Sequence, residues 1–445
     1  MKRRELTCED AIRIAKDQKV RAIRMMFMDI TGINKNVEIP VEDLSLAFEG
    51  KIMFDGSSIE GFSRIEESDV FLRPDPSTFA VFPWTNGDHR VARLICDVYT
   101  PEGESFAGCP RSVLKRVMKE AQDMGYTMAA GPEMEFFLFL LDPQGRATVQ
   151  TQDQGSYFDL SPIDRGEDCR SQIVSYLECM GFKMEASHHE VAPGQHELDF
   201  AYSDALSTAD NLATLRLVVK TVARQHGLHA TFMPKPIFGI NGSGMHTHQS
   251  LFCGDRNCFY DEKGEYQLSD TCLHYMGGLL QHVREFTAIT NPLVNSYKRL
   301  VPDFEAPVHI AWSQRNRSPL IRVPAPRHQG TRVELRSPDP SCNPYLAFAV
   351  MLKAGLDGIR NKIDPGPPVN ENIYNMCEDK REDLKIGALP VSLNEAIHCM
   401  EESSLVRQTL GDHIFENFLK AKKLEWSMYI QEVHPWELGR YLRIY

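Results

Sequence analysis

The sequence has no long hydrophobic run. No stretch of the 445 residues approaches the roughly 18 consecutive apolar residues that a membrane-spanning helix needs. The chain begins Met1-Lys-Arg-Arg-Glu-Leu, so charged residues stand where a secretory signal would have its apolar centre. We therefore expect no membrane partner and a cytoplasmic protein.

The sequence also lacks an excess of basic residues. It has 49 Lys and Arg against 61 Asp and Glu, which gives a formal net charge of −12. A chain with this balance repels phosphate polymers on average. We therefore expect no nucleic acid among its partners.

The cysteines do not form a disulfide or zinc framework. The chain has 11 cysteines, an odd number, with no Cys-x-x-Cys motif, and only Cys253 and Cys258 lie close together. The Gly-Asp-Arg-Asn segment between these two is typical of a hairpin turn. We predict reduced thiols, and a metal clip or disulfide between Cys253 and Cys258 is the alternative.

The composition of the chain and the positions of its prolines and glycines predict two domains. The apolar fraction of 42% and the charged fraction of 25% are those of an ordinary globular protein, and the length exceeds a single typical domain. Strand patterns over 22–29, 35–39 and 90–99 indicate a small β-rich unit, and the glycines and serines of 53–62 predict irregular structure there. The segment 100–110 contains two prolines and two glycines. We place the boundary in it, with an N-terminal domain over 1–105 and a catalytic domain over 106–445.

The larger part mixes helices with strands. Apolar residues at steps of three and four predict a long amphipathic helix over 205–226. Aromatic and aliphatic residues predict a strand over 131–141. Further helices are expected at 112–124, 344–362, 393–400 and from 411 to about 425.

Two carboxylates interrupt the apolar strand at 131–141. Glu133 and Glu135 are two residues apart, so they share one face of the strand. Buried like charges repel, and a buried carboxylate without a partner shifts its pKa. The pair therefore indicates either a cation beside the strand or a strand end exposed to water.

A second acidic segment contains three histidines. Residues 187–200 hold Glu190 and Glu197 on either side of a Pro193-Gly194 turn. A hairpin at this turn would bring both carboxylates toward one ion. For each of the histidines, hydrogen bonding or core packing is the more common role.

Two further predicted strands each carry candidate ligand-binding side chains on one face. Glycines of the segment 241–250 allow a close approach of the backbone to a ligand, and His246 and His248 share a face. The segment is not a phosphate-binding Walker loop, because the chain has no Gly-x-x-x-x-Gly-Lys-Ser/Thr motif. In the segment 331–336, alternation places Glu334 between two arginines on one side.

Together these segments supply a set of hard ligands, namely Glu133, Glu135, Glu190, Glu197, His246 and Glu334. Oxygen-rich sets favour Mg²⁺ or Mn²⁺ over zinc. Further arginines occur in 297–307 and 313–324. Acidic metal ligands beside several arginines are typical of phosphoryl transfer, in which cations neutralise the charge on the moving phosphate.

Six motifs resemble the signatures of glutamine synthetase, in that family's order and over nearly the whole chain. They are Phe54-Asp-Gly-Ser-Ser-Ile-Glu-Gly-Phe, Gly131-Pro-Glu-x-Glu-Phe-Phe, Ser187-His-His-Glu-Val-Ala-Pro-Gly-Gln-His-Glu, Lys235-Pro-Ile-Phe-Gly-x-Asn-Gly-Ser-Gly-Met-His, Tyr297-Lys-Arg-Leu-Val-Pro and Asn316-Arg-Ser-Pro-Leu-Ile-Arg. The length, the stretch 61–67 around Arg64 and the absence of tyrosine from 383–390 resemble the prokaryotic type I-alpha branch.

The resemblance implies a fold and a reaction. The fold is α+β, with a small N-terminal β-grasp domain before a large α/β catalytic domain built on an antiparallel sheet. In the reaction ATP phosphorylates the side-chain carboxylate of L-glutamate, and ammonia displaces phosphate from γ-glutamyl phosphate to give glutamine. The family works as a dodecamer of two hexameric rings, uses Mg²⁺ or Mn²⁺, and has small regulatory proteins of nitrogen control among its partners.

The resemblance also implies roles for individual residues. One metal would be held by Glu135, Glu190 and Glu197, and the other by Glu133, His246 and Glu334. The glutamate-binding positions are Asn241, Gly242, Arg299, Glu305, Arg317, Arg322 and Arg336. The ATP-binding positions are Glu185, His248, Ser250, Arg317 and Arg332, although some relatives have asparagine in place of His248. Asp55 would take a proton from ammonium at a neighbouring subunit's site, Glu305 would close over the intermediate, Arg317 and Arg336 would meet the phosphoryl group, and Arg64 would be regulatory.

Two other functions fit the same motifs in part. A γ-glutamyl-amine ligase would use the same metals with a different amine, and a non-catalytic nitrogen-sensing protein would keep only the fold. The intact Asp55 segment and the 241–244 loop argue against the first, and the complete set of six ligands argues against the second. The sequence does not indicate effectors such as glutamine or 2-oxoglutarate, nor a choice between Mg²⁺ and Mn²⁺.

Overall fold

The computed structural model describes the chain except for residues 1–5, 60, 62–68, 303, 305 and 317. Arg64, Glu305 and Arg317, which the sequence assigns to the site or its regulation, therefore lie outside the described residues.

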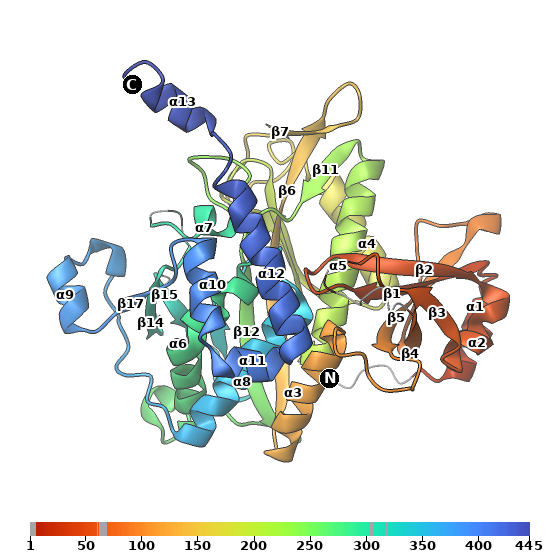
Figure 1. Cartoon of the computed structure of the whole chain (residues 1–445), viewed down its shortest axis with the longest axis horizontal. Helices are drawn as coiled ribbons and strands as arrows, with labels where there is room; N and C mark the ends of the chain where they lie inside the picture. The colour runs from red at the N-terminus through yellow and green to blue at the C-terminus, as the bar shows by residue number, and fades with distance from the viewer. Residues whose placement is uncertain (1–5, 60, 62–68, 303, 305, 317) are drawn as a thin grey trace.

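A five-stranded sheet forms the small N-terminal part of the molecule, in the order β2-β1-β5-β4-β3 (Figure 1). The pairing of β1 with β5 is parallel and the other pairings are antiparallel. Two helices, α1 and α2, pack their apolar sides on this sheet. The bounds are α1 Cys8–Asp17, β1 Ala22–Met28, β2 Asn34–Pro40, α2 Leu44–Phe48, β3 Ile52–Asp55, β4 Asp69–Val81 and β5 Val91–Tyr99.

One prediction for this part was wrong. The start of the segment 53–62 is the edge strand β3 and not irregular structure. Ile52 and Phe54 are half-buried while Met53 and Asp55 are exposed, an alternation that suits one covered face. The glycine and serines that suggested a turn begin only at Gly56, after the strand has ended.

The large sheet has the order β17-β14-β15-β16-β12-β6-β9-β8 along its main path. Apart from the parallel pair β14 and β15, the pairings on this path are antiparallel, which confirms the predicted sheet type. Strands β7, β10 and β11 also pair with β6, and β13 pairs with β12. The bounds are β6 Thr127–Leu141, β7 Ala147–Thr151, β8 Met184–His189, β9 Gln195–Phe200, β10 Ser203–Asp204, β11 Leu228–Thr231, β12 Met245–Cys253, β13 Arg256–Asn257, β14 His309–Ser313, β15 Pro319–Arg322, β16 Val333–Leu335 and β17 Gly387–Ala388.

Helices pack against the large sheet and share one core with it. The predicted long helix is α5, and its periodic residues Leu212, Leu215, Val219 and Val222 are fully buried. The other predicted helices are also present, with bounds within a few residues. The bounds are α3 Pro110–Asp123, α4 Glu167–Cys179, α5 Ala205–Gln225, α6 Asp270–Thr290, α7 Ser296–Arg299, α8 Pro344–Asn361, α9 Glu378–Asp383, α10 Leu393–Glu401, α11 Ser404–Leu410, α12 Asp412–Tyr429 and α13 Pro435–Tyr441.

A buried arginine joins the small sheet to the helices of the large part. Arg111 of α3 contacts Asp75 of β4 at 2.7 Å, Asp97 of β5 at 2.9 Å and Asp210 of α5 at 2.9 Å. Tyr345 of α8 donates a further hydrogen bond to Asp210. This ion-pair cluster links strands and helices from both sides of the predicted boundary, which itself stays a prediction.

The C-terminal arm projects from the rest of the chain (Figure 1). Helix α13 and the residues around it have apolar side chains in solvent, including Val433, Trp436, Leu442 and Ile444. Exposed apolar side chains gathered on one projecting segment are typical of a contact surface.

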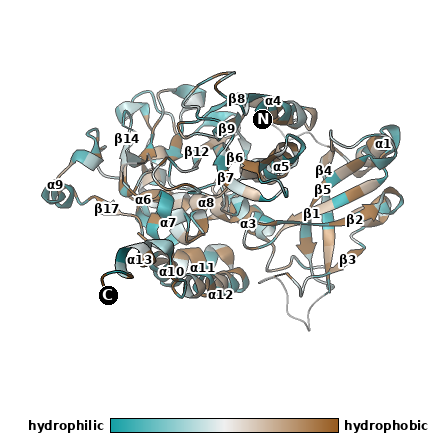
Figure 2. Ribbon diagram, turned by 90° about the horizontal axis from the view of Figure 1, so that it is seen from above, coloured by the Kyte–Doolittle hydropathy of each residue, from teal (hydrophilic) through white to brown (hydrophobic). Residues whose placement is uncertain are grey.

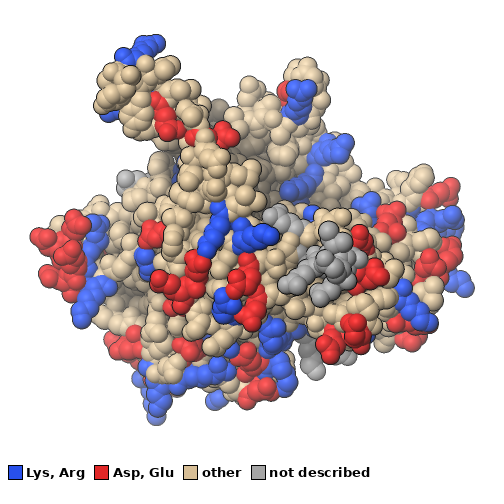
Figure 3. All heavy atoms as spheres, in the orientation of Figure 1, with Lys and Arg blue, Asp and Glu red and all other residues tan. Residues whose placement is uncertain are grey.

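The rest of the visible surface is polar. On the face in Figure 3, lysines and arginines are interspersed with aspartates and glutamates among the atoms drawn in colour. Within the described part of the chain, none of the helices has the length and apolar content to cross a bilayer.

Candidate active site

Carboxylates from neighbouring strands of the large sheet meet on one face. Glu133 of β6 lies opposite His246 of β12, and Glu135 lies opposite Glu197 of β9. Glu334 of β16 lies opposite His248. Because directly opposed residues point to the same side of a sheet, these side chains converge.

One group consists of Glu133, His246 and Glu334, whose ligand atoms lie within 4.8 Å of one another. Nδ1 of His246 is 2.9 Å from Glu133 and 3.9 Å from Glu334. Glu133 also contacts Nε2 of His248 at 2.7 Å. The geometry brings together the three residues that the family resemblance assigns to the second metal.

A neighbouring group consists of His188, Glu190 and Glu197, again within 4.8 Å. Nε2 of His188 lies 3.1 Å from Glu197, and its Nδ1 lies 3.8 Å from Glu190. Sequence reasoning assigned His188 no ligand role. His188 lies opposite Glu197 in the β8–β9 hairpin, and this position became visible only from the strand register of the structure.

Glu135 connects the two groups. Its Oε1 lies 4.0 Å from Nε2 of His246, and its Oε2 accepts hydrogen bonds from Gln195 and from the backbone N–H of Gly244, both at 2.9 Å. Burial and the charges of Glu197 and Glu190 raise the pKa of Glu135 well above its usual value. Neutral hydrogen bonds alone do not balance its charge.

The electrostatics of the cluster fit a bound divalent cation. Burial and then the nearby charge of Glu133 raise the pKa of Glu197 to about 9. Carboxylates that resist ionisation at neutral pH are stabilised in their charged form when a cation lies between them. Four or five oxygen ligands with one or two imidazoles suit Mg²⁺ or Mn²⁺.

Arginines surround the far end of the cluster. Glu334 is fully buried, and Arg322 and Arg336 both donate to it, Arg336 at 2.6 Å. Although burial raises the pKa of Glu334, the positive charge of Arg336 contributes to a net lowering. Arg332 donates to Nδ1 of His248 at 3.2 Å, and Nε of Arg336 has no partner among the described residues.

The glycine-rich loop is packed tightly beside these residues. A Cβ on Gly242 would lie 2.3 Å from the carbonyl oxygen of Pro234, so only glycine fits there. Arg299 is buried and donates to the carbonyl oxygens of residues 336–338. Arg299 therefore braces the strand end that carries Arg336, and Asn241 lies at the loop's start.

A pocket of about 400 Å³ opens next to the cluster. Its walls contain Glu133 together with four of the residues to which the family resemblance gives an ATP-binding role, namely Glu185, His248, Ser250 and Arg332. Asp199, which sequence reasoning missed, also lines it. Burial and the charge of Glu197 raise the pKa of Asp199 to about 9.

Comparison with protein families decides what this architecture is. Residues 107–441 match the family model described as "Glutamine synthetase, catalytic domain", and residues 19–101 match "Glutamine synthetase, beta-Grasp domain". The chain belongs to the glutamine synthetase family. The matches also confirm the predicted fold, a β-grasp domain before a catalytic domain.

Full-length relatives agree with this assignment. A glutamine synthetase of Methanosarcina mazei is 56% identical over 436 residues, which covers 98% of each chain. One of Staphylococcus aureus is 54% identical over 446 residues and covers both chains completely. Among solved structures, a GmaS complex with ADP superposes with a TM-score of 0.88 at 32% identity, covering 98% of this chain and 99% of the other. The Plasmodium falciparum glutamine synthetase gives 0.87 at 25% identity with the same coverage.

One predicted site residue, Asp55, lies away from the carboxylate cluster. Asp55 is at the end of β3, the outer edge of the small sheet, whereas the six proposed ligands are on or next to the large sheet (Figures 1 and 2). Its carboxylate is exposed and accepts hydrogen bonds from the backbone and hydroxyl of Ser57. These bonds lower the pKa of Asp55.

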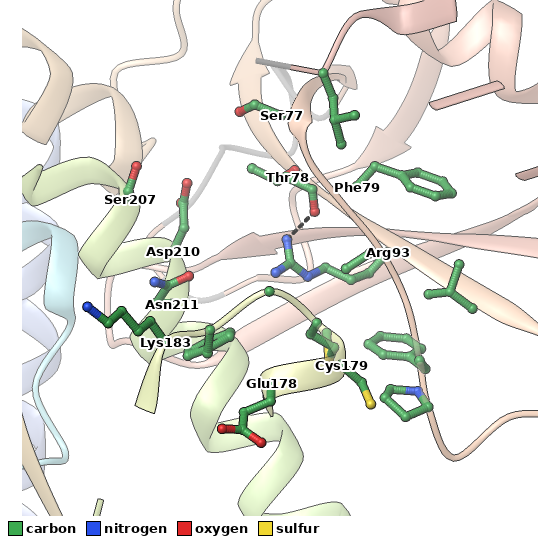
Figure 4. Close-up of a pocket in the computed structure, with 18 of the residues that line it drawn as sticks. Ser77, Thr78, Phe79, Arg93, Glu178, Cys179, Lys183, Ser207, Asp210 and Asn211 are labelled. Carbon is green, nitrogen blue, oxygen red and sulfur yellow. Dashed lines mark hydrogen bonds between the residues drawn. The ribbon is translucent and has the colours of Figure 1, made fainter. Parts of the chain in front are cut away.

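A second cavity of about 770 Å³ lies between the two parts of the chain (Figure 4). Thr78, Phe79 and Arg93 come from the small sheet, and Ser207 and Asn211 come from the first turns of α5. None of the six proposed metal ligands lines it. Of the two cavities, the smaller one is lined by a proposed metal ligand, Glu133.

Proposed function

We propose that the carboxylate cluster and its adjacent pocket ligate ammonia to the side-chain carboxylate of L-glutamate, with ATP converted to ADP and phosphate through γ-glutamyl phosphate. The observation that carries this is the convergence of several buried carboxylates beside arginines and a nucleotide-sized pocket, in a chain that matches glutamine synthetases along its whole length. The reaction makes glutamine and assimilates ammonium.

The six ligands hold two divalent ions, Mg²⁺ or Mn²⁺. Glu135, Glu190 and Glu197 hold one, with His188 as a further donor, and Glu133, His246 and Glu334 hold the other. Ions bound there would neutralise charge on the phosphate oxygens of the nucleotide. Because Glu133 borders both the cluster and the pocket, the terminal phosphates meet this end of the cluster.

The chain's own groups orient the two substrates. Glu185, His248, Ser250 and Arg332 line the nucleotide pocket, and the 241–242 backbone with Arg299 and Arg322 forms the glutamate side. Arg336, whose Nε has no partner among the described residues, meets the transferred phosphoryl group together with Arg317. Glu305 closes over the intermediate, and Arg64 takes part in regulation.

Asp55 supplies the base that deprotonates ammonium, in the site of a neighbouring chain. Its distance in the fold from the cluster supports an active site shared between subunits. The projecting apolar C-terminal arm supports a homo-oligomer, which we propose is a dodecamer of two hexameric rings. We also place the chain in the type I-alpha branch and propose small nitrogen-regulatory proteins as its partners. We place it in the cytoplasm, in keeping with its 11 free cysteines, because thiols stay reduced in that compartment.

A phosphate-release assay tests the proposal. We expect phosphate release with glutamate, ATP and ammonium, and none above background when putrescine replaces ammonium. Release with putrescine alone would favour a γ-glutamyl-amine ligase, and release with neither amine would favour a non-catalytic sensor. Glu334→Ala should abolish synthesis, whereas Glu371→Ala, which changes an exposed ion pair with Lys380, should not.

Mixed assemblies test the shared site. Asp55→Asn should keep ATP and glutamate binding but lose about 10²–10⁴-fold in amide formation, because the variant lacks the base. Asp55→Asn chains and Glu334→Ala chains, dissociated and reassembled together, should regain part of the activity. Mixed rings verified by native mass spectrometry but still inactive would mean that each chain completes its own site.

A further inference from the structure

The β8–β9 hairpin has a second buried polar face behind the proposed metal ligands. His188 pairs with Glu197 across the hairpin, and the next pair is His189 with His196. Because successive strand residues point to opposite faces, His189 and His196 point away from the metal site. Both side chains are completely buried.

Asp153 connects this face to the turn of the hairpin. It lies between β7 and α4, and its Oδ1 accepts hydrogen bonds from Nε2 of His189 at 3.1 Å and from the backbone N–H of Gly194 at 2.9 Å. Nδ1 of His189 lies 2.6 Å from the carbonyl oxygen of Glu190. The Asp153 and His189 pair therefore fixes the backbone at both ends of the turn 190–194.

Arg170 of α4 stabilises the other half of the cluster. Its Nη1 donates to Asp164 at 2.6 Å and lies 3.0 Å from Nδ1 of His196. Its Nε donates to Ser187 of β8 at 2.9 Å. The helix, the 152–166 loop and both strands of the hairpin are thus joined in one buried network.

The composition of this network is that of a metal site, with four ligand atoms within 4.8 Å from Asp153, Asp164, His189 and His196. Its packing argues against an ion. The Arg170 guanidinium already supplies a cation, and a Cβ on Gly155 would lie 2.6 Å from Nε2 of His189. A Cβ on Gly166 would lie 2.5 Å from Nε2 of His196. The backbone is pressed against both rings, so the protein's own charges fill the space.

We propose that Asp153 and His189 are positioning residues that hold the turn 190–194, so that Glu190 and Glu197 meet the same ion as Glu135. This inference rests on the proposed role of those carboxylates as metal ligands. Hydrogen-bonding partners behind the ligands of a metal site typically change its affinity 10–100-fold when they are altered.

Gln195 extends the constraint to the next strand. Its backbone oxygen accepts the N–H of Glu190 at 2.8 Å, and its Nε2 donates to Glu135 at 2.9 Å. A displacement of the turn would therefore move two ligands relative to a third. The network acts through the backbone, since neither Asp153 nor His189 reaches the metal face itself.

Direct Mn²⁺ binding to the metal-free protein tests the inference without a turnover assay. Asp153→Asn keeps the size of the side chain but removes its charge and places an amide against the donors of Gln152 and Arg165. We expect its Mn²⁺ dissociation constant to rise about tenfold or more. Asp159→Asn in the same loop, whose carboxylate accepts a hydrogen bond from the backbone N–H of Ser156 near the surface, is the matched control and should leave the constant unchanged.

A second variant covers the case in which Asp153→Asn does not fold. Gly155→Ala leaves every charge in place but presses a methyl group on His189, and it should weaken Mn²⁺ binding in the same direction. Gly387→Ala, where the added Cβ comes no nearer than 3.5 Å to Ile310, is its control. Folded variants of both kinds with the affinity of the unchanged protein would overturn the positioning role.

Glu197→Gln separates this inference from the proposed function. If Glu197→Gln does not weaken Mn²⁺ binding, the ligand assignment itself is wrong. If Glu197→Gln weakens binding and neither Asp153→Asn nor Gly155→Ala does, the ligands stand and the positioning role is wrong.

Discussion

Two regions of this glutamine synthetase bury several carboxylates, and the regions differ in what balances the negative charge. At the junction with the small sheet, Asp75, Asp97 and Asp210 surround Arg111. Burial lowers the pKa of Arg111, but the charge of Asp210 raises it, and the net shift is upward. At the active site, Glu135 and Glu197 face other carboxylates, and their pKa values rise. Arg111 balances the charge of the junction, whereas Glu135 and Glu197 form no ion pair with an arginine among the described residues.

The difference teaches which acidic clusters are functional. When every carboxylate of a cluster pairs with one buried arginine, as at the junction, each negative charge has a fixed partner, and removing the arginine is strongly destabilising. A cluster whose carboxylates raise each other's pKa leaves a place for a ligand ion. The network of Asp153, Asp164 and Arg170 belongs to the first kind despite its metal-like composition.

The largest expected effect is on the junction. Arg111→Met leaves three buried carboxylates without their cation, and we expect a loss of about 3–5 kcal/mol in the free energy of unfolding. Denaturant unfolding followed by circular dichroism measures it. Arg13→Gln, which removes an exposed pair with Asp10, is the control and should change little. A loss for Arg111→Met no larger than that of the control would remove the contrast between the regions.

A smaller stabilisation should come from adding the missing cation to the active site. At about a hundredfold excess over its dissociation constant, Mn²⁺ should stabilise the metal-free protein by about 2.7 kcal/mol. Glu135→Gln should lose most of this gain while folding normally without metal, because it removes a charge that other carboxylates repel. Thermal melts with and without Mn²⁺ show both effects, and equal gains for the two proteins would contradict the assignment.

The metal-free active site should also make stability depend on pH. The pKa of Glu197 is raised to about 9, above its unfolded value of about 4.5, so folding is favoured by this group most at low pH. That contribution is lost as the pH rises through the folded pKa. The melting temperature of the metal-free protein should therefore fall more between about pH 6 and about pH 9 than that of Glu197→Gln. Saturating Mn²⁺ should abolish the difference.

The smallest effect should come from a cluster whose cation can titrate. His282 of α6 lies between Glu285 at 2.8 Å and Asp357 at 2.9 Å. Burial lowers the pKa of His282, but the two carboxylates raise it more. Its stabilising contribution is complete below the unfolded pKa and is lost as the pH rises through the folded one. His282→Gln should therefore cost more stability at acidic than at alkaline pH, and a cost independent of pH would show that the ring acts only by packing.

Much of the active site could be predicted from local patterns. Alternation in the strand that became β6 placed Glu133 and Glu135 on one face, and the Pro193-Gly194 turn placed Glu190 near Glu197. These predictions were correct because strand periodicity and turn chemistry depend on a few adjacent residues. The irregular structure expected at 53–62 was wrong at its start, because pairing with β4 overrides the local turn signal.

The sequence by itself determined which ligand types are present, which strand faces carry them and which family the motifs resemble. Only the tertiary structure decided that β16, β12, β6 and β9 are neighbours in register, which places Glu334, His246, Glu133 and Glu197 around one space. It also decided that Arg111 and Arg170 lie within their acidic clusters, while among the described residues no arginine forms an ion pair with Glu135 or Glu197. The reason is that strand order and ion pairing join residues far apart in the chain, and no local pattern encodes those pairings.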